Sequence, residues 1–154
     1  MIINVYGSTG IIGKTSLSII KNYFPNYKVN LLCAKRNYKL LAKQCNEFEV
    51  RYAYIDNQKN YAKLKSFFKK EIKILNKENL NEYLKESKSD LSILAVSGYE
   101  SLKYLELILA NTKKIGIVSK ESIVSAGHVL KKISKASAFS IRYYKKSKKV
   151  KIIK

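Results

Sequence analysis

The stretch Gly7-Ser8-Thr9-Gly10-Ile11-Ile12-Gly13 joins a strand-like run, Ile2–Tyr6, to a segment whose apolar residues recur at helical spacing. A strand that ends in a glycine turn lets the backbone approach phosphates, and the helix that follows offers free N–H groups and a positive dipole end. We therefore expect a nucleotide pyrophosphate to bind here. The alternative is a tight turn that packs the helix against the strand and holds no ligand.

The glycine spacing in this stretch is GxxGxxG, one position away from the GxGxxG pattern of many dinucleotide sites. The neighbouring Gly13-Lys14-Thr15 could suggest the phosphate loop of nucleoside triphosphatases. That loop needs a glycine five residues before its Gly-Lys pair, and Ser8 stands there. The spacing thus argues against a triphosphatase.

Short apolar runs alternate with amphipathic stretches along the chain, which indicates a parallel sheet with crossover helices. The expected strands cover 2–6, 29–34, 52–55, 72–75, 91–96 and 115–118, and the expected helices 17–24, 40–48, 61–68, 78–86, 102–109 and 121–133. The predicted fold is α/β, a Rossmann-like doubly wound parallel sheet in a single domain over 1–133. Residues 134–154 form a basic tail in which only 150–153 has strand character.

The end of the second expected strand reads Cys33-Ala34-Lys35-Arg36-Asn37 and contains no acid. NAD-binding proteins usually place Asp or Glu here to hold the ribose 2′-OH. Cationic and amide side chains fit a 2′-phosphate instead, so the sequence favours NADP over NAD. Alternatively, Lys35 and Arg36 are two more solvated charges in a basic chain.

A third polar cluster, Val118-Ser119-Lys120-Glu121-Ser122, follows the last expected strand of the sheet. Ser119 as a helix cap and Glu121 in the first turn would explain part of it. The carboxyl end of a parallel strand is also where ligands bind in such sheets. His128, the single histidine, is expected on a helix surface without a catalytic role.

The 154 residues include 31 Lys+Arg and 11 Asp+Glu, for a net charge of +20. Residues 128–154 hold 10 of these basic residues and no acid. Arginine, which reads phosphates and bases through its planar fork, occurs only at Arg36, Arg51 and Arg142. We therefore do not expect nucleic-acid binding, although a basic polyanion-binding domain stays open as an alternative.

Cys33 and Cys45 lie twelve positions apart without a CxxC motif, which argues against a disulfide framework and a zinc site. No secretory signal and no apolar run long enough to cross a bilayer is evident. We expect a cytoplasmic protein with reduced thiols and no membrane contact.

Taken together, these motifs resemble the N-terminal domain of 1-deoxy-D-xylulose 5-phosphate reductoisomerase, an NADPH-dependent family of non-mevalonate isoprenoid biosynthesis. Residues 7–13 are similar to the family's GSTGxIG loop, 34–37 to its A-G-K-N segment, and 39–48 to the helix that follows. Residues 120–124, with Ala126-Gly127, resemble its A-N-K-E-S-L-V stretch. The resemblance covers about 1–133 and departs from the family at Lys35, where the family has Gly, and at Ser119, where it has Asn.

The resemblance implies site residues one by one. Thr9 to Ile12 would contact the NADPH pyrophosphate region, Arg36 and Asn37 the adenosine 2′-phosphate side, and Lys120 the substrate, 1-deoxy-D-xylulose 5-phosphate. The cofactor-binding residues expected are Gly7, Ser8, Thr9, Gly10, Ile11, Ile12, Arg36, Asn37, Ser119 and Glu121.

The family's metal-binding Asp-Ser-Glu-His segment has no counterpart in the 154 residues. Mg²⁺ or Mn²⁺ is thus implied only for the full-length family, and we expect the chain to be a truncated form that is inactive alone, with no catalytic or metal residues of its own. Two alternatives remain open, a vestigial nucleotide-binding domain without catalysis and half of a split enzyme. The partner would be either a second copy, in a homodimer, or a separate C-terminal half.

Overall fold

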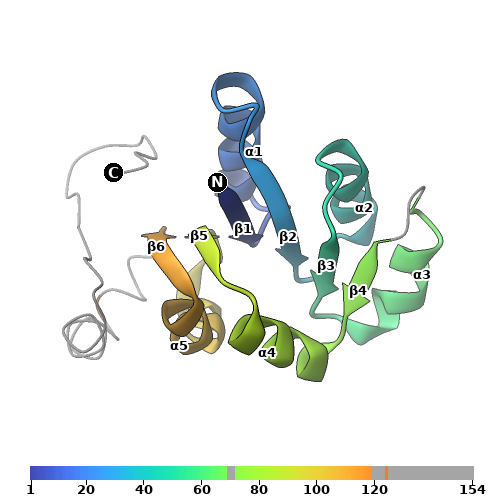
Figure 1. The fold of residues 1–154 in the computed structure, drawn as a ribbon. Coiled ribbons are helices and arrows are strands. Elements are labelled where there is room, and N and C mark those ends of the chain that lie inside the picture. The colour runs from blue at the N-terminus through green and yellow to red at the C-terminus, as the bar shows by residue number, and fades with distance from the viewer. Residues whose placement is uncertain (69–71, 119–123, 125–154) are drawn as a thin grey trace.

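The computed structural model describes residues 1–68, 72–118 and 124 (Figure 1). Within them, parallel strands form one six-stranded sheet in the order β4-β3-β2-β1-β5-β6. The strands are β1 (Ile2–Tyr6), β2 (Lys28–Ala34), β3 (Tyr52–Ile55), β4 (Lys73–Leu75), β5 (Ser89–Leu94) and β6 (Thr112–Ile117). The helices are α1 (Ile11–Tyr23), α2 (Tyr38–Glu47), α3 (Tyr61–Lys65), α4 (Lys77–Glu86) and α5 (Leu102–Asn111), with short 3₁₀ turns η1 (Gln58–Asn60) and η2 (Gly98–Ser101).

The strand order reverses between β1 and β5. The chain moves outward from β1 to β4, crosses the sheet through α4 and returns beside β1 as β5. In open parallel sheets a crevice forms at the carboxyl ends of the two strands that flank such a reversal. The expected doubly wound, Rossmann-like α/β fold is confirmed, and the loop that follows β1 lies at its switch point.

Helices lie on both faces of the sheet (Figure 1), and an apolar cluster packs on each face. On one face, α1, α2 and α3 contribute Leu17, Leu41 and Leu64 among others. On the other face, α4 and α5 contribute residues such as Leu84 and Ile108. Because both faces are covered, β1 and β5 are almost entirely buried. Apolar side chains of the two strands pack on both faces, Val5 and Ile93 on one and Tyr6 and Leu94 on the other.

One buried polar group interrupts β1. Asn4 is 1% exposed, and its Oδ1 accepts a hydrogen bond from the Tyr83 hydroxyl at 3.4 Å. That hydroxyl in turn accepts one from Asn30 Nδ2 at 2.7 Å. The register between β1 and β2 shifts at this point. A buried polar group costs free energy unless it is hydrogen-bonded, so these contacts compensate for the burial of Asn4.

Two strands differ from the sequence prediction by more than one residue, since β5 spans 89–94 instead of 91–96 and β6 spans 112–117 instead of 115–118. β5 begins at Ser89 because buried hydroxyls satisfy one another: Ser89 Oγ lies 3.1 Å from Ser92 Oγ and donates to Thr112 Oγ1 at 3.0 Å. β6 begins at Thr112, and its lysines, Lys113 and Lys114, are exposed on the outer strand of the described sheet. Charged residues are common on such strands. Polar residues that pair across strands carry no apolar signal in the sequence.

Several sequence predictions concern parts of the chain outside the described residues. They are the helix at 121–133 apart from Val124, the strand at 150–153, the basic tail 134–154 and the surface position of His128. The boundary after residue 133 therefore stays a prediction.

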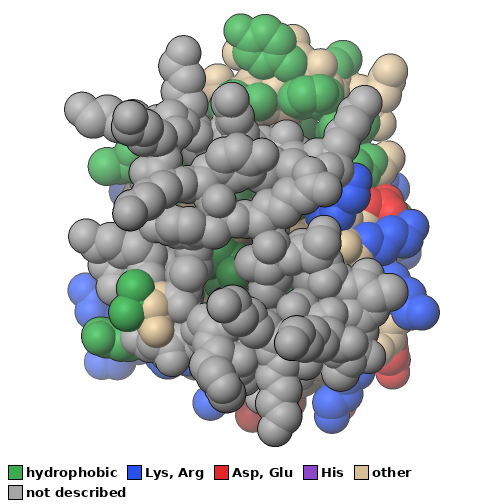
Figure 2. Space-filling model, turned by 90° about the vertical axis from the view of Figure 1, so that its left-hand side faces the viewer, with side chains coloured by type: hydrophobic (Ala, Val, Ile, Leu, Met, Phe, Trp, Pro, Cys, Tyr) green, Lys and Arg blue, Asp and Glu red, His purple; other side chains and the backbone are tan. Residues whose placement is uncertain are grey.

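Surface charge in the described part is mixed. On the face toward the β6 side, Lys and Arg side chains lie beside Asp and Glu side chains (Figure 2). Ion pairs join Lys21 to Glu47 and Lys113 to Asp90. Among the described residues, no helix is both long and apolar enough to cross a membrane.

The buried centre of the sheet makes a stability test possible. Leu32 on β2 is fully buried, whereas Tyr23 at the end of α1 is 74% exposed. We expect Leu32→Ala to lower the free energy of unfolding by about 2–5 kcal/mol, because it removes apolar contacts and leaves a cavity. The control Tyr23→Ala should change it by no more than about 0.5 kcal/mol in urea denaturation. Equal effects of the two substitutions would contradict the described core.

Candidate nucleotide-binding site

The loop after β1 approaches the end of β5 backbone to backbone. Gly7 has φ +82°, in the left-handed region that favours glycine. A Cβ atom at this position would lie 2.6 Å from the Ala95 carbonyl oxygen and 3.2 Å from Val96 Cγ2. Only glycine fits this conformation and this space. The first glycine of the loop is therefore required by the sheet itself.

Gly13 sets the distance between α1 and the same loop. A Cβ atom on Gly13 would overlap the Gly7 carbonyl oxygen and lie 2.6 Å from Ser8 Cα. Gly10 is less restricted, since its nearest neighbour would be the Gly7 oxygen at 3.4 Å. Gly7 and Gly13 therefore pack α1 against the sheet, as expected for a tight turn that holds no ligand. Gly10, between them, is exposed, so this part of the loop surface stays open.

Hydrogen bonds anchor the loop to the neighbouring strand and helix. The Gly7 and Ser8 N–H groups both donate to the Cys33 carbonyl at 2.9 Å. Gln44 of α2, only 5% exposed, donates from Nε2 to the Ser8 carbonyl at 2.9 Å. Sequence reasoning missed Gln44; the signal was a polar residue between Leu41 and Cys45 on the apolar face of the helix.

The beginning of α1 is built as an open helix end. Gly10 is the N-cap residue and provides no side-chain acceptor, and the first turn of α1 contains no acid. The first N–H groups of a helix lack intrahelical partners and carry the positive end of its dipole. Ile11 is 79% exposed and Thr9 half-buried. These backbone groups can bind an anion such as a pyrophosphate.

Ser8 differs from the other predicted residues of the loop. Its side chain is fully buried, and its Oγ has no hydrogen-bond partner in the part of the chain that the structure describes. Ile12 is half-buried against the core of the α1 side. Cofactor contacts of Ser8 and Ile12, like those of the rest of the loop, stay predictions.

The segment after β2 is held in place by its backbone. The Asn57 N–H donates to the Lys35 carbonyl at 3.0 Å, and Asn60 Nδ2 donates to the Arg36 carbonyl at 2.9 Å. Asn37 caps α2, because its Oδ1 accepts from the Leu40 N–H at 3.1 Å. The Arg36 side chain is exposed, and its guanidinium has no ion-pair partner among the described residues. Arg36 is therefore available to a phosphate, while Asn37 already has a structural role.

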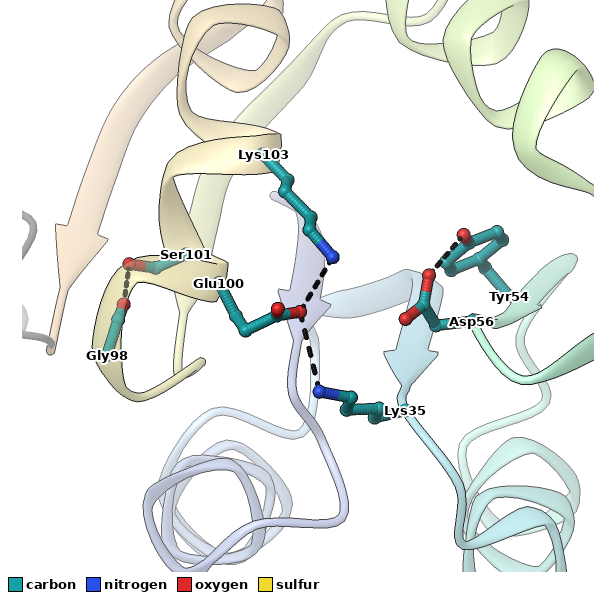
Figure 3. A network of polar contacts seen from close by, with 7 residues as sticks. All are labelled: Lys35, Tyr54, Asp56, Gly98, Glu100, Ser101 and Lys103. Carbon is teal, nitrogen blue, oxygen red and sulfur yellow. Dashed lines mark hydrogen bonds and ion pairs between the residues drawn. The ribbon is translucent and has the colours of Figure 1, made fainter.

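A polar network lies beside this segment (Figure 3). Glu100 of η2 accepts a hydrogen bond from Lys103 Nζ at 2.8 Å and pairs with Lys35 Nζ at 3.5 Å. The hydrogen bond from Lys103 is the main cause that lowers the pKa of Glu100 below its ordinary value, so its carboxylate is ionised at neutral pH. Nearby, the Tyr54 hydroxyl donates to Asp56 Oδ1 at 3.0 Å. Burial is the main cause that raises the pKa of Tyr54.

The third predicted cluster falls where the structure gives no description. Ser119, Lys120 and Glu121 lie outside the described residues, so their predicted contacts with cofactor and substrate stay predictions. In residues 1–68, 72–118 and 124, no group of three or more His, Cys, Asp or Glu side chains could hold a metal ion. Among the described residues, the open N-terminus of α1 and the exposed Arg36 are the groups that could hold the phosphates of a nucleotide.

Gly13 and Gly116 provide a test of the loop, because a side chain is crowded at one and free at the other. Gly13→Ala would push α1 away from Gly7 and Ser8, whereas a Cβ atom on Gly116 in β6 would meet nothing within 4 Å. We expect Gly13→Ala to lower the free energy of unfolding by about 1–3 kcal/mol. The matched control Gly116→Ala should stay within about 0.5 kcal/mol of the parent in urea denaturation. A Gly13→Ala protein as stable as the control would show that the close contact is not required.

Comparison with known proteins agrees with this geometry. A model of the family described as 1-deoxy-D-xylulose 5-phosphate reductoisomerase matches residues 3–127. The Pelagibacter ubique reductoisomerase is 35% identical over 133 residues, which cover 84% of this chain and 34% of the relative. The relative from Wolbachia pipientis of Culex pipiens is 32% identical and covers 90% of this chain and 36% of its own length. The chain spans about a third of the length of the curated relatives it matches.

Solved structures agree as well. The Zymomonas mobilis reductoisomerase in complex with NADPH matches with a TM-score of 0.81 and 26% identity, over 90% of this chain and 37% of that one. A reductoisomerase structure with NADPH, fosmidomycin and magnesium also has a TM-score of 0.81, at 25% identity, over 91% of this chain and 35% of that one. By sequence and by fold, the chain belongs to the 1-deoxy-D-xylulose 5-phosphate reductoisomerase family.

Proposed function

We propose that this chain binds NADPH in the crevice between β1 and β5 and forms the nucleotide-binding part of a 1-deoxy-D-xylulose 5-phosphate reductoisomerase. The observation that carries the proposal is the glycine loop. Gly7 and Gly13 are fixed by close backbone contacts, and between them the loop presents the uncapped N-terminus of α1 at the topological switch point.

Each part of the crevice has a separate task in this proposal. The N–H groups of the first turn of α1 bind the pyrophosphate, and Gly10 allows the phosphates to approach the backbone. The Arg36 guanidinium binds the 2′-phosphate, because it is exposed and its backbone is held by Asn60. Bound NADPH supplies a hydride. The contribution of this chain is to orient the nucleotide, and the family resemblance adds Ser119 and Glu121 as further cofactor contacts and Lys120 as a substrate contact.

We propose the complete reaction only for the whole enzyme. In this reaction 1-deoxy-D-xylulose 5-phosphate is rearranged with the help of a divalent metal, and the rearranged product is reduced to 2-C-methyl-D-erythritol 4-phosphate. The described residues offer no metal cluster, so we assign no step through the metal to them. Assembly with the remaining two thirds of a family member would complete the enzyme, whereas a homodimer of this chain would still lack the metal-binding segment. The free, buried thiols of Cys33 and Cys45 support the cytoplasm as its location.

Nucleotide titration tests the proposed binding. We expect the chain to bind NADPH more tightly than NADH, because only NADPH has a 2′-phosphate. Arg36→Ala should weaken NADPH binding about tenfold and leave NADH binding nearly unchanged, since it removes a charge-assisted hydrogen bond. Isothermal titration calorimetry measures both affinities.

The matched control is Arg51→Ala. Arg51 is also exposed but precedes β3, at the opposite end of the sheet from Arg36. The Arg51→Ala variant should bind NADPH and NADH with the affinities of the parent. If the parent binds neither nucleotide, the loop has only the packing role, and the proposed function is wrong.

An activity assay tests whether this chain catalyses the reaction without the metal-binding Asp-Ser-Glu-His segment. The 154 residues contain no Asp-Ser-Glu-His segment. We therefore expect no oxidation of NADPH upon addition of 1-deoxy-D-xylulose 5-phosphate with Mg²⁺ or Mn²⁺, followed as absorbance of the reduced nicotinamide. A full-length family member serves as the positive control. Substrate-dependent oxidation by the purified chain would contradict this expectation.

A further inference from the structure

Lys35 lies directly after Ala34, the last residue of β2, and next to Arg36. The carboxyl end of β2 is where dinucleotide-binding sheets recognise the 2′ position of the adenosine ribose. Lys35 is therefore a second cation, beside Arg36, at the end of the strand where NADPH and NADH are distinguished.

The Lys35 side chain reaches across the crevice. Its Nζ lies 3.5 Å from Glu100 Oε2, and Glu100 belongs to η2, which follows β5 (Figure 3). In the sheet, β1 lies between β2 and β5. The ion pair therefore spans the carboxyl end of β1, next to the loop that we propose binds the pyrophosphate. The Lys35 ammonium is already directed toward the path of the nucleotide.

The contact between Lys35 and Glu100 is one that a phosphate can replace. Both side chains are about half exposed, at 57% and 44%, and exposed ion pairs are weak and screened by salt. Glu100 also has a closer partner in Lys103, whose Nζ lies 2.8 Å from the same oxygen. If Lys35 moves away, Glu100 keeps a counter-charge. A phosphate dianion offers Lys35 more negative charge and more acceptor oxygens than the shared carboxylate.

The backbone of Lys35 does not need to move for this exchange. Its carbonyl is held by the Asn57 N–H, and the adjacent Arg36 carbonyl by Asn60. Only the flexible four-carbon side chain has to change its rotamer. Lys35 and Arg36 would then approach one phosphate group from adjacent positions of the same fixed segment.

We infer that Lys35 is a specificity-determining residue of this chain, which exchanges Glu100 for the 2′-phosphate of the bound nucleotide. The inference rests on the proposed binding of NADPH. It gives Lys35 a function of its own beside Arg36, and it gives Glu100 the role of the partner that positions Lys35 before the nucleotide binds.

The experiment compares two small probes that differ only at the 2′ position, adenosine 2′,5′-bisphosphate and adenosine 5′-monophosphate, by calorimetry on the full chain. The measured quantity is the ratio of their affinities. Lys35→Ala should reduce this ratio about tenfold by weakening the bisphosphate alone, the loss expected for one charge-assisted hydrogen bond. Lys35→Met, which keeps the apolar part of the side chain, should do the same.

Lys85→Ala is the matched control. Lys85 is an exposed lysine in the last turn of α4, which leads to the amino end of β5, away from the crevice. The ratio of the two affinities measured for Lys85→Ala should equal that of the parent. Circular dichroism and urea denaturation verify that each variant folds.

Glu100→Gln tests the exchange itself. The substitution removes the charge that pairs with Lys35. We therefore expect the affinity ratio of bisphosphate to monophosphate to rise about two- to threefold when Glu100→Gln is made in the parent, and to stay unchanged when it is made in Lys35→Ala. A rise in both backgrounds would mean that Glu100 repels the phosphate directly, and it would overturn the exchange.

The remaining outcomes separate the inference from the proposed function. If NADPH binds the parent but Lys35→Ala and Lys35→Met keep the ratio, or weaken both probes equally, the inference is wrong and the proposed function stands. If the parent binds neither NADPH nor the bisphosphate, both are wrong.

Discussion

The described structure depends on one close approach of backbone to backbone. Gly7 lies against the Ala95 carbonyl, and Gly13 lies against Gly7 and Ser8, so that β1, α1 and the end of β5 meet without side chains between them. Side chains at these points would separate α1 from the sheet, because packed interiors have no free volume to absorb them. The same contact leaves an uncapped helix N-terminus at the switch point. Packing and anion binding are therefore two consequences of one constraint.

The carboxyl edge of the sheet combines contributions from the segments after three neighbouring strands. The segment after β1 offers backbone N–H groups, the segment after β2 offers Lys35 and Arg36, and the segment after β5 offers Glu100. Polar residues that look structural hold these parts in register: Gln44 fixes the Ser8 carbonyl, and Asn60 fixes the Arg36 carbonyl. Folding already orders these binding groups, so a charged ligand can bind without the entropy cost of ordering them.

Sequence reasoning was most successful where one physical signal dominates. Apolar runs bounded by turns located all six described strands, and β1 and β3 have the expected bounds. It failed at Ser89 and Thr112, because hydroxyls that satisfy each other across strands look like loop residues in a sequence. It also missed Gln44 and Glu100, whose partners lie 36 and 65 residues away along the chain. Asn37 caps α2 through its Oδ1, and its expected contact with the cofactor stays a prediction.

By itself, the sequence determined the alternation of strands and helices, the glycine loop, the acid-free end of β2 and the resemblance to a family, because each of these is encoded by neighbouring residues. Only the tertiary structure decided which glycines are irreplaceable, that the Arg36 guanidinium has no ion-pair partner within the described part of the chain, and that Lys35 meets Glu100 across β1. The physical reason is that these properties depend on distances between segments that are far apart in the chain. Local patterns specify elements, and the order of the strands brings their ends together.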